Sequence, residues 1–338
     1  MLPSEIFHKF QHQHIVIVGD VMIDRYLMGS VSRISPEAPV PVVLHQSTED
    51  RLGGAANVAL NVQALGGIPL LCSVVGNDTI GQKLWAEILP ANGISNEGIL
   101  LSDTRKTTLK TRILGNSQQM LRIDHEDTHD LEEEDSQQLL QKLEQLLDNY
   151  PVEAIILQDY NKGVLTAQLI SSVLTLATSK GIFTAVDPKK ANFFAYRGVD
   201  LFKPNLKEVR ESSPFPIVTS LESLESAAVF LTEKLENKFT MLTLSEKGLF
   251  LKGNTSGSLY PTITRRIADV SGAGDTVISI ATMALAAGLD LPVVAQLSNL
   301  AGGQVCEFPG VVPVNLALLK TEFAHREPTP YTPILKSF

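Results

Sequence analysis

The strongest chemical signal in the sequence is the run Asp269-Val-Ser-Gly-Ala-Gly-Asp-Thr276, which leads into a long apolar helical stretch. Its glycines let the backbone turn so that successive N–H groups point out of a helix N-terminus, where the helix dipole favours an anion. Asp275 is a carboxylate inside this predicted anion site, and such a group suits the acceptance of a proton from an attacking hydroxyl. The alternative is that Ser271 or Asp275 only caps the helix.

Two acids and a glycine pair indicate a site for a polyol. Asp20 and Asp24 follow the first predicted strand, and carboxylates at such a strand end are strong acceptors for sugar hydroxyls. Gly53 and Gly54 allow close approach of the backbone, and Asn57 can both donate and accept a hydrogen bond. The alternative for the two acids is that they are solvated residues of a turn. The alternative for the glycine pair is a tight strand-to-helix turn, with Asn57 simply inside the helix.

Three further polar segments follow predicted strands, namely residues 158–163, 187–189 and 203–208. Asn205 and Glu208 are one helical turn apart, so an amide and a carboxylate there can hold the water shell of a phosphate-bound Mg²⁺. The same spacing also fits a capping box. Because the carboxyl ends of parallel strands meet at one edge of a sheet, we expect these segments to form a common site with the acids and glycines above.

Basic residues lie on a predicted hairpin over residues 107–124. Lys110 and Arg112 are two apart and share one strand face, and Arg122 lies on the returning strand. Such a group could clamp a sugar phosphate. The alternative is a solvated strand face.

The elements that must position these residues alternate between strands and helices, which predicts βαβ units and a mostly parallel sheet covered by helices on both faces. Two segments break the alternation, at about residues 25–50 and 103–125, and we expect them to form a small antiparallel lid over the site. The predicted strands are Ile15–Val18, Leu70–Val75, Ala154–Leu157, Phe183–Val186, Leu201–Phe202 and Thr240–Leu244. The predicted helices are Ala55–Leu65, Ile80–Leu89, Leu131–Leu147, Thr166–Thr178 and Leu221–Leu235.

Composition narrows the class of protein. The 338 residues include 28 Lys and Arg against 37 Asp and Glu, and the net charge of −9 argues against nucleic-acid or membrane-surface partners. The two cysteines are too few for a disulfide framework, and neither a secretory signal nor an apolar run long enough to span a bilayer is present. We therefore expect a cytoplasmic protein, with residues 1–338 forming one domain because no shift in composition separates the motifs.

The motifs together resemble the ribokinase/PfkB sugar kinases. The runs that carry the resemblance are GGAANVA (residues 53–59), DPK (187–189), KPNLKE (203–208) and DVSGAGDT (269–276), in this order along the chain. Within that family, four further runs are similar to those of kinases acting on D-glycero-β-D-manno-heptose 7-phosphate: GDVMIDRY, SRISPEAPVPVV, QQMLRIDHE and QDYNKG. The fold implied is a ribokinase-like three-layer α/β sandwich with a mostly parallel central sheet and a small β lid.

The resemblance implies a role for each residue. Asp275 would take the proton of the sugar 1-hydroxyl, and N–H groups of Gly272, Ala273 and Gly274 would stabilise the transferring phosphoryl group, giving the heptose 1,7-bisphosphate. The residues implied at ATP are Asn205, Glu208, Ser245, Gly248 and Asp269, with Mg²⁺ held by Glu208 through water. The residues implied at the sugar and its phosphate are Asp20, Asp24, Gly53, Gly54, Asn57, Lys110, Arg122 and Lys189. A homodimer formed through the lid is also implied.

The sequence departs from its relatives near the C-terminus. Residues 306–311 read CEFPGV, where relatives read close to Gly-Lys-x-Gly-Thr beside the adenine pocket and, in many, a K⁺ site, so a K⁺ requirement stays open. No HxGH run of a fused adenylyltransferase is present, so we expect the kinase step only, with a separate adenylyltransferase in ADP-heptose (lipopolysaccharide core precursor) synthesis. Two other readings remain: a PfkB kinase of another phosphosugar, and a catalytically silent regulator that binds sugar or nucleotide.

Overall fold

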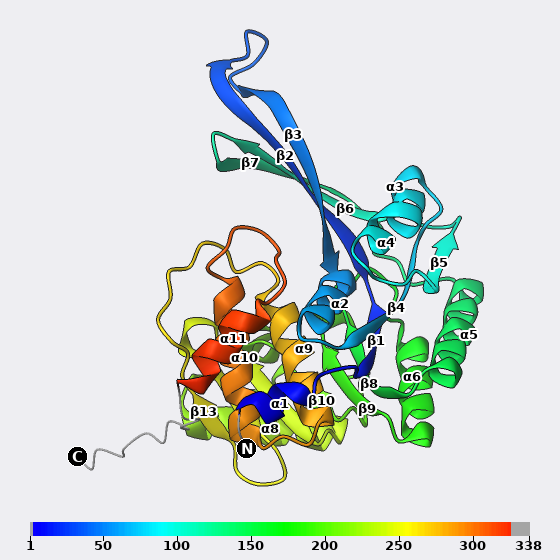
Figure 1. Cartoon of the computed structure of the whole chain (residues 1–338), viewed down its shortest axis with the longest axis vertical. Coiled ribbons are helices and arrows are strands. Elements are labelled where there is room, and N and C mark those ends of the chain that lie inside the picture. The colour runs from blue at the N-terminus through cyan, green and yellow to red at the C-terminus, as the bar shows by residue number, and fades with distance from the viewer. Residues whose placement is uncertain (1–2, 326–338) are drawn as a thin grey trace.

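The computed structural model describes residues 3–325, so both ends of the predicted domain lie outside the described residues. A nine-stranded sheet runs through the molecule in the order β13-β12-β11-β10-β9-β8-β1-β4-β5 (Figure 1). Its strands are β1 (His14–Gly19), β4 (Ile68–Gly76), β5 (Gly98–Ser102), β8 (Val152–Gln158), β9 (Phe183–Asp187), β10 (Leu201–Phe202), β11 (Phe239–Thr243), β12 (Leu249–Lys252) and β13 (Ser258–Tyr260). Pairing is parallel from β5 to β11, and β12 and β13 continue the sheet antiparallel.

Side-chain alternation along the strands separates two apolar layers. Ile15 and Ile17 of β1 point into one core cluster, and Val16 and Val18 point into the other, as a period of two requires. The first cluster is covered by α1 (Pro3–His8), α2 (Ala55–Ala64), α9 (Ala273–Ala286), α10 (Leu291–Val305) and α11 (Leu316–Ala324). The second is covered by α5 (Glu133–Asn149), α6 (Ala167–Lys180), α7 (Leu206–Ser212) and α8 (Leu221–Leu235). The predicted three-layer α/β sandwich is therefore confirmed.

The short elements connect these layers. The helix predicted over Ile80–Leu89 corresponds to three consecutive pieces: α3 (Thr79–Lys83), a π-helical turn (Leu84–Ile88) and α4 (Leu89–Ala91). Two 3₁₀ turns cover Lys190–Asn192 and Ser245–Lys247. Within residues 3–325, none of the helices combines the length and apolar character that crossing a membrane requires.

A second, four-stranded sheet projects from the first, and we call it the lid sheet (Figure 1). It contains β2 (Val21–Ile34), β3 (Pro41–Gly54), β6 (Thr108–Gly115) and β7 (Gln118–His125) in the order β3-β2-β6-β7. The predicted hairpin is confirmed, since Asn116 and Ser117 adopt φ angles of 51° and 66° in a two-residue turn. The prediction of an all-antiparallel lid was wrong, because β2 and β6 pair in parallel. They can do so because the whole segment from α2 to β5 separates them in the chain.

The register of the central strands gathers the polar segments at one edge. Gly19 of β1 pairs with Gln158 of β8, and Gln158 pairs with Asp187 of β9. The chain beyond each strand continues the ladder, since the N–H of Asp20 donates to Gln158 and the N–H of Lys203 donates to Val186. The carboxyl ends of four strands therefore lie side by side, below the lid sheet.

Candidate active site

Asp275 lies in the first turn of α9, which packs against β8, β9 and α2. Its side chain is buried, with 2% of the residue exposed, and accepts three hydrogen bonds. Nδ2 of Asn57 donates to Oδ2 at 2.7 Å, while Nε2 of Gln158 and the hydroxyl of Tyr160 donate to Oδ1 at 3.0 and 2.7 Å. Three neutral donors from α2, the end of β8 and the following loop thus converge on one carboxylate.

Burial raises the pKa of Asp275 to about 6, because a charged carboxylate is poorly solvated there. The donors Asn57 and Tyr160 lower the pKa, the nearby carboxylate of Asp187 raises it, and the Lys203 ammonium lowers it. A carboxyl with a pKa in this range is ionised at neutral pH and is still basic enough to take a proton from a hydroxyl in a transition state. This is the environment that a general base needs.

The first turn of α9, where the sequence predicts an anion site, carries this carboxylate. Gly272 is the N-cap residue at φ 81°, and a Cβ there would lie 2.8 Å from Nδ2 of Asn57. A Cβ on Gly274 would lie 3.4 Å from Oδ2 of Asp187 and 3.8 Å from Nζ of Lys203. Lys203 is 2% exposed and pairs with Asp187 at 3.0 Å. The buried ammonium group of Lys203 therefore lies close to Gly274 in the first turn of α9, whereas the N–H of Ala273 donates to the carbonyl oxygen of Val270 at 3.3 Å.

Asn205 and Glu208 form the capping box at the start of α7, so the structural alternative for this pair is confirmed. The side chain of Glu208 does more than cap, since Oε1 accepts from Nζ of Lys189 at 2.7 Å. Burial would lower the pKa of Lys189, but the carboxylates of Asp187 and Glu208 outweigh it and raise the pKa. Lys189 therefore lies at the Glu208 side of the site, whereas Lys110 and Arg122, grouped with it in the prediction, lie on the lid sheet.

The two acids after β1 have different surroundings. Asp20 is 1% exposed, and its carboxylate accepts from the N–H groups of Tyr160, Lys162 and Val164 at 2.7 to 3.1 Å, so it holds the loop after β8. Burial and the nearby Asp159 carboxylate raise the pKa of Asp20, these N–H groups lower it, and the net result is a pKa of about 6. Asp24 lies on strand β2 of the lid sheet, and its carboxylate pairs with Nη1 of Arg112 at 2.5 Å.

The two acids also explain the glycine pair that precedes α2. A Cβ on Gly53 would lie 2.3 Å from Oδ2 of Asp24, and a Cβ on Gly54, the N-cap residue of α2, would lie 2.3 Å from the carbonyl oxygen of Asp20. The small residues therefore let β3 approach Asp24 closely and let the start of α2 approach the main chain of Asp20. The predicted sugar-side residues of β2, β3 and α2 are neighbours.

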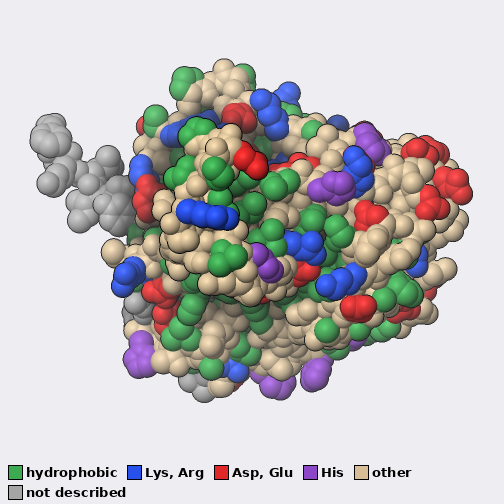
Figure 2. Space-filling model, turned by 90° about the horizontal axis from the view of Figure 1, so that it is seen from above, with side chains coloured by type: hydrophobic (Ala, Val, Ile, Leu, Met, Phe, Trp, Pro, Cys, Tyr) green, Lys and Arg blue, Asp and Glu red, His purple; other side chains and the backbone are tan. Residues whose placement is uncertain are grey.

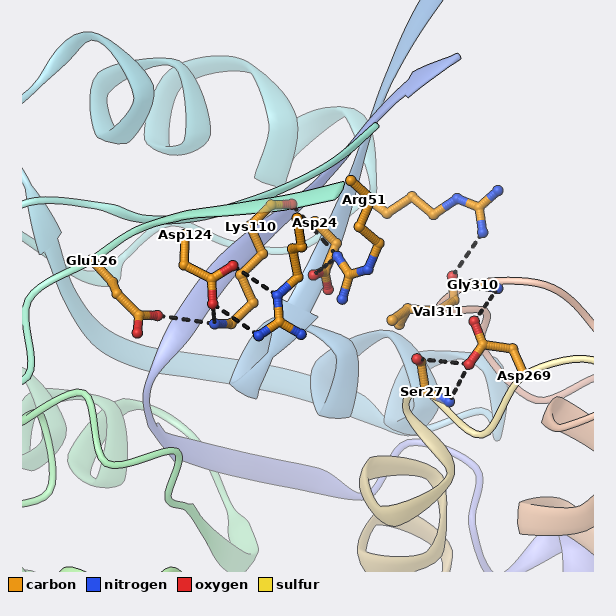
Figure 3. Close-up of polar contacts among 11 residues, drawn as sticks. Asp24, Arg51, Lys110, Asp124, Glu126, Asp269, Ser271, Gly310 and Val311 are labelled. Atoms are coloured by element: carbon orange, nitrogen blue, oxygen red, sulfur yellow. Dashed lines mark hydrogen bonds and ion pairs between the residues drawn. The ribbon is translucent and has the colours of Figure 1, made fainter. Parts of the chain in front are cut away.

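The lid bases form a chain of ion pairs with lid acids (Figure 3). Lys110 pairs with Asp124 at 3.1 Å and with Glu126 at 2.9 Å, and Arg122 pairs with Asp124 at 2.8 Å. Glu126 also accepts from Nζ of Lys162 at 2.6 Å, which joins the lid sheet to the loop after β8. Side-chain exposure differs, at 14% for Lys110 and 50% for Arg122. Lys110 is therefore the lid base more enclosed by the fold.

Asp269 organises the chain on the other side of α9 (Figure 3). Oδ1 accepts from the N–H and hydroxyl of Ser271 at 2.9 and 2.8 Å, and Oδ2 accepts from the N–H of Gly310 at 3.0 Å. Burial would raise the pKa of Asp269, but these hydrogen bonds outweigh it and lower the pKa. From the lid sheet, Arg51 donates to the carbonyl oxygen of Pro309 at 3.0 Å, so the loop over residues 306–311 is held from two sides.

Ser245 begins the 3₁₀ turn after β11, and Gly248 directly follows that turn. Next to this turn is a pocket of about 230 Å³ lined by Thr219, Leu244, Lys247, Leu259 and Pro261. It is mostly apolar, as the binding of a flat heterocycle requires.

The sequence prediction singled out the segments after the strands but gave no role to four of their residues that contact Asp275 or its neighbours: Gln158, Tyr160, Asp187 and Lys203. All four belong to the segments that were singled out after strands, so their position at strand ends was the available signal. Periodicity does not show which of these side chains turn inward. Within residues 3–325, His, Cys, Asp and Glu side chains do not gather in groups of three or more that could hold a metal ion.

Comparison with known proteins gives a consistent result. A family model described as pfkB family carbohydrate kinase matches residues 12–316. The bifunctional protein HldE of Methylobacillus flagellatus is 40% identical over 324 residues, which cover 95% of this chain and 66% of that protein. The bifunctional protein HldE of Shewanella sp. (strain MR-4) is 40% identical over 297 residues, which cover 88% of this chain and 60% of that protein. The chain thus spans less than two thirds of the length of these curated relatives.

Solved structures show the same fold at low identity. Escherichia coli phosphofructokinase-2 in complex with potassium has a TM-score of 0.77 at 18% identity, covering 93% of this chain and 99% of that one. Arabidopsis thaliana ribokinase complexed with ribose and ATP has a TM-score of 0.68 at 15% identity, covering 92% and 99%.

Proposed function

The chain belongs to the pfkB family of carbohydrate kinases, and we propose that it transfers the γ-phosphoryl group of ATP to the 1-hydroxyl of D-glycero-β-D-manno-heptose 7-phosphate. The proposal of phosphoryl transfer rests mainly on the environment of Asp275, a buried carboxylate with a pKa of about 6 in the first turn of α9, where we propose an anion site. The similarity to HldE proteins and the four sequence runs in the lid and loop segments support the heptose substrate.

In the proposed step, Asp275 accepts the proton of the sugar 1-hydroxyl as its oxygen forms a bond to the γ-phosphorus, while the bond to the β-phosphate oxygen breaks and ADP leaves. N–H groups of Gly272, Ala273 and Gly274, with Lys203 behind them, stabilise the negative charge on the transferring group. Positioning and electrostatics of this kind supply most of the catalysis of phosphoryl transfer.

The residues present fit a nucleotide with Mg²⁺. The apolar pocket beside Ser245 and Gly248 suits the base, and the N-terminus of α9 suits the phosphates. Mg²⁺ bound to the phosphates would neutralise charge on them, and Glu208 with Asn205 is our candidate to hold its waters. Asp269 and the carbonyl groups of residues 306–311 offer oxygen donors of the type that K⁺ takes, and we propose a K⁺ site there; the similar phosphofructokinase-2 structure contains potassium.

The sugar side of the proposed site comprises β2, β3, α2 and the lid bases. Asp24 and Asn57 would bind hydroxyl groups of the sugar, with Asp20, Gly53 and Gly54 shaping the backbone around them. Lys110 and Arg122 would bind the 7-phosphate, exchanging contacts with Asp124 and Glu126 for contacts with the ligand. The structure pairs Lys189 with Glu208, so we assign it to the nucleotide side of the proposed site.

The lid sheet also exposes apolar side chains, and hydrophobic side chains are visible among charged ones in the view from above (Figure 2). The exposed large hydrophobic residues of the lid strands and their tip are Ile34, Val40, Leu44, Met120, Leu121 and Ile123. We propose that a second copy of the chain covers them in a homodimer, since so many exposed apolar side chains on one small sheet favour an interface.

An assay with ATP, Mg²⁺ and a panel of sugar phosphates tests the proposed function. We expect turnover of heptose 7-phosphate to a heptose 1,7-bisphosphate. Turnover of fructose or tagatose phosphates in its place would assign another phosphosugar. Binding of ATP and sugar with no turnover of any panel member would assign the silent regulator.

A further inference from the structure

Tyr160 contacts groups from both sides of the site. Its hydroxyl donates to Oδ1 of Asp275 at 2.7 Å, and Nζ of Lys189 lies 5.6 Å from the centroid of its ring. Its backbone N–H donates to Asp20 at 2.7 Å, and Asp20 binds two further N–H groups of the same loop. The position of the tyrosine is thus set by its main chain, independently of the carboxylate that its hydroxyl contacts.

The two oxygens of Asp275 have unequal surroundings. Oδ1 accepts from both Gln158 and Tyr160, whereas Oδ2 accepts from Asn57 alone. Each carboxylate oxygen offers about two lone-pair directions, so Oδ1 is fully used and Oδ2 keeps one direction free.

We propose that Tyr160 is a positioning residue that occupies Oδ1 of Asp275 and thereby leaves Oδ2 as the oxygen that takes the proton from the sugar hydroxyl. This inference rests on the proposed kinase function of the site. It assigns a role to the tyrosine of the QDYNKG run that is separate from sugar or nucleotide binding.

The charged groups that face Asp275 are Asp187, Lys203 and Lys189, which lie at or after the ends of β9 and β10. Asp187 at the end of β9 raises the pKa of Asp275, and Lys203 after β10 lowers it, while the residue contributed by α2, Asn57, is a neutral donor. Burial and the carboxylates of Asp275 and Asp187 raise the pKa of Tyr160 well above its ordinary value. The tyrosine therefore stays protonated, and stays a donor, over the whole working range of pH.

The variant Tyr160→Phe tests the proposal through the pH profile of kcat/KM for the sugar. Loss of a donor to a buried carboxylate raises its pKa, so we expect the acid limb to move up by about one pH unit. At pH 6 the variant should be about tenfold slower than at its own high-pH plateau. An acid limb at the wild-type position would overturn the proposal. If the KM for the sugar also fell while the acid limb stayed in place, the tyrosine hydroxyl would only occupy space that the substrate needs.

Tyr196→Phe is the matched control. Its hydroxyl is buried and donates to Oδ2 of Asp159 at 2.7 Å, a residue next to the same loop. We expect this variant to lose thermal stability without moving the acid limb. Equal shifts in both variants would overturn the proposal, because they would show a general effect of loosening the loop.

Two further measurements keep the test independent of folding and of the substrate assignment. Site-specific replacement of Tyr160 by 3-fluorotyrosine keeps the hydroxyl but strengthens it as a donor, and should move the acid limb down. The second measurement is the free energy of unfolding of Tyr160→Phe minus that of the double variant Tyr160→Phe, Asp275→Asn. This difference should depend on pH up to about pH 7, whereas the same difference between wild type and Asp275→Asn should depend on pH only up to about pH 6. This comparison needs no turnover, so a failure of heptose 7-phosphate as substrate and a failure of the tyrosine assignment give different results.

Discussion

The guanidinium group of Arg51, on lid strand β3, donates a hydrogen bond to the main-chain carbonyl oxygen of Pro309 in the loop after α10. The same guanidinium stacks 4.8 Å from the ring centroid of Tyr26, and its Nη1 lies 3.5 Å from the carbonyl oxygen of Val311. Arg51 thus connects the lid sheet to the loop over residues 306–311, which Asp269 holds from its other side. The proposed sugar side of the site is therefore in direct contact with the proposed K⁺ and nucleotide side.

For Arg51→Ala we expect KM for ATP to rise about five- to tenfold and the dependence on K⁺ concentration to shift, because the loop loses one of its two anchors. Steady-state kinetics at varied ATP and K⁺ measure both effects. Arg25→Ala is the matched control, since Arg25 also lies on the lid sheet but pairs with Asp50. Equal changes in the two variants would show a general effect of lid charge.

Asp275→Asn should lower kcat by about 10²–10⁴, because the amide cannot take the proton of the sugar hydroxyl. Binding of ATP should change little, since the proposed anion site at α9 would use backbone N–H groups and Lys203 rather than the side chain of Asp275. Calorimetric titration with a non-hydrolysable ATP analogue, together with initial rates, checks both parts. Turnover within a few-fold of wild type would exclude Asp275 as the base.

Asp20→Asn should change how stability depends on pH. The folded-state pKa of Asp20 is raised from 3.8 to about 6, so its contribution to stability is complete below the unfolded pKa and is lost as the pH rises through the folded one. The free energy of unfolding of wild type minus that of the variant should therefore fall by about 2–3 kcal/mol between pH 3.8 and pH 6. Denaturant unfolding at several pH values measures it, and a difference that stays flat would contradict the burial of an ionisable group there.

Lys110→Ala should raise KM for the sugar phosphate by about tenfold or more and leave KM for ATP within about twofold, because a charged hydrogen bond to phosphate is lost. Arg122→Ala should have a smaller effect, since half of that side chain is exposed and screened. Lys180→Ala, at a surface pair with Asp148, is the control. Effects of equal size on sugar and ATP would indicate a solvated lid face.

Leu121→Asp should separate a homodimer, because it places a charge among the exposed apolar side chains of the lid sheet. Sedimentation velocity at micromolar concentration measures the oligomeric state. Val229→Asp, at an exposed apolar position of α8, is the control and should leave the state unchanged. A wild-type protein that sediments as a monomer would rule out the lid interface.

Local pattern was enough to predict most of the framework. Alternation along β1 identifies a strand buried on both faces, and the apolar run after Asp275 identifies α9, whose residues 275–285 are all buried. Position at a strand end was enough to group the polar segments, because parallel strands must bring their carboxyl ends to one edge.

Long-range geometry accounts for what was missed. The parallel pairing of β2 with β6 depends on contacts across more than fifty residues, which periodicity does not report. Tyr160 and Lys203 turn inward because main-chain hydrogen bonds to Asp20 and Val186 fix their loops, and side-chain type alone does not reveal this. Lys189 pairs with Glu208, although its charge suited the phosphate site proposed at the lid equally well.

The main chain leaves the core for β2 directly after Asp20 and returns from β3 at Ala55, and these two residues are themselves joined, since the N–H of Ala55 donates to the carbonyl oxygen of Asp20 at 2.9 Å. Val21–Gly54 is therefore an excursion whose two ends already meet. Doubling the length of such a loop costs only about 0.6 kcal/mol of closure entropy. Evolution or design could thus exchange much of this segment for strands of another length and sequence while leaving Asp275 and the first turn of α9 in place, provided that the contact of Arg51 with Pro309 is kept.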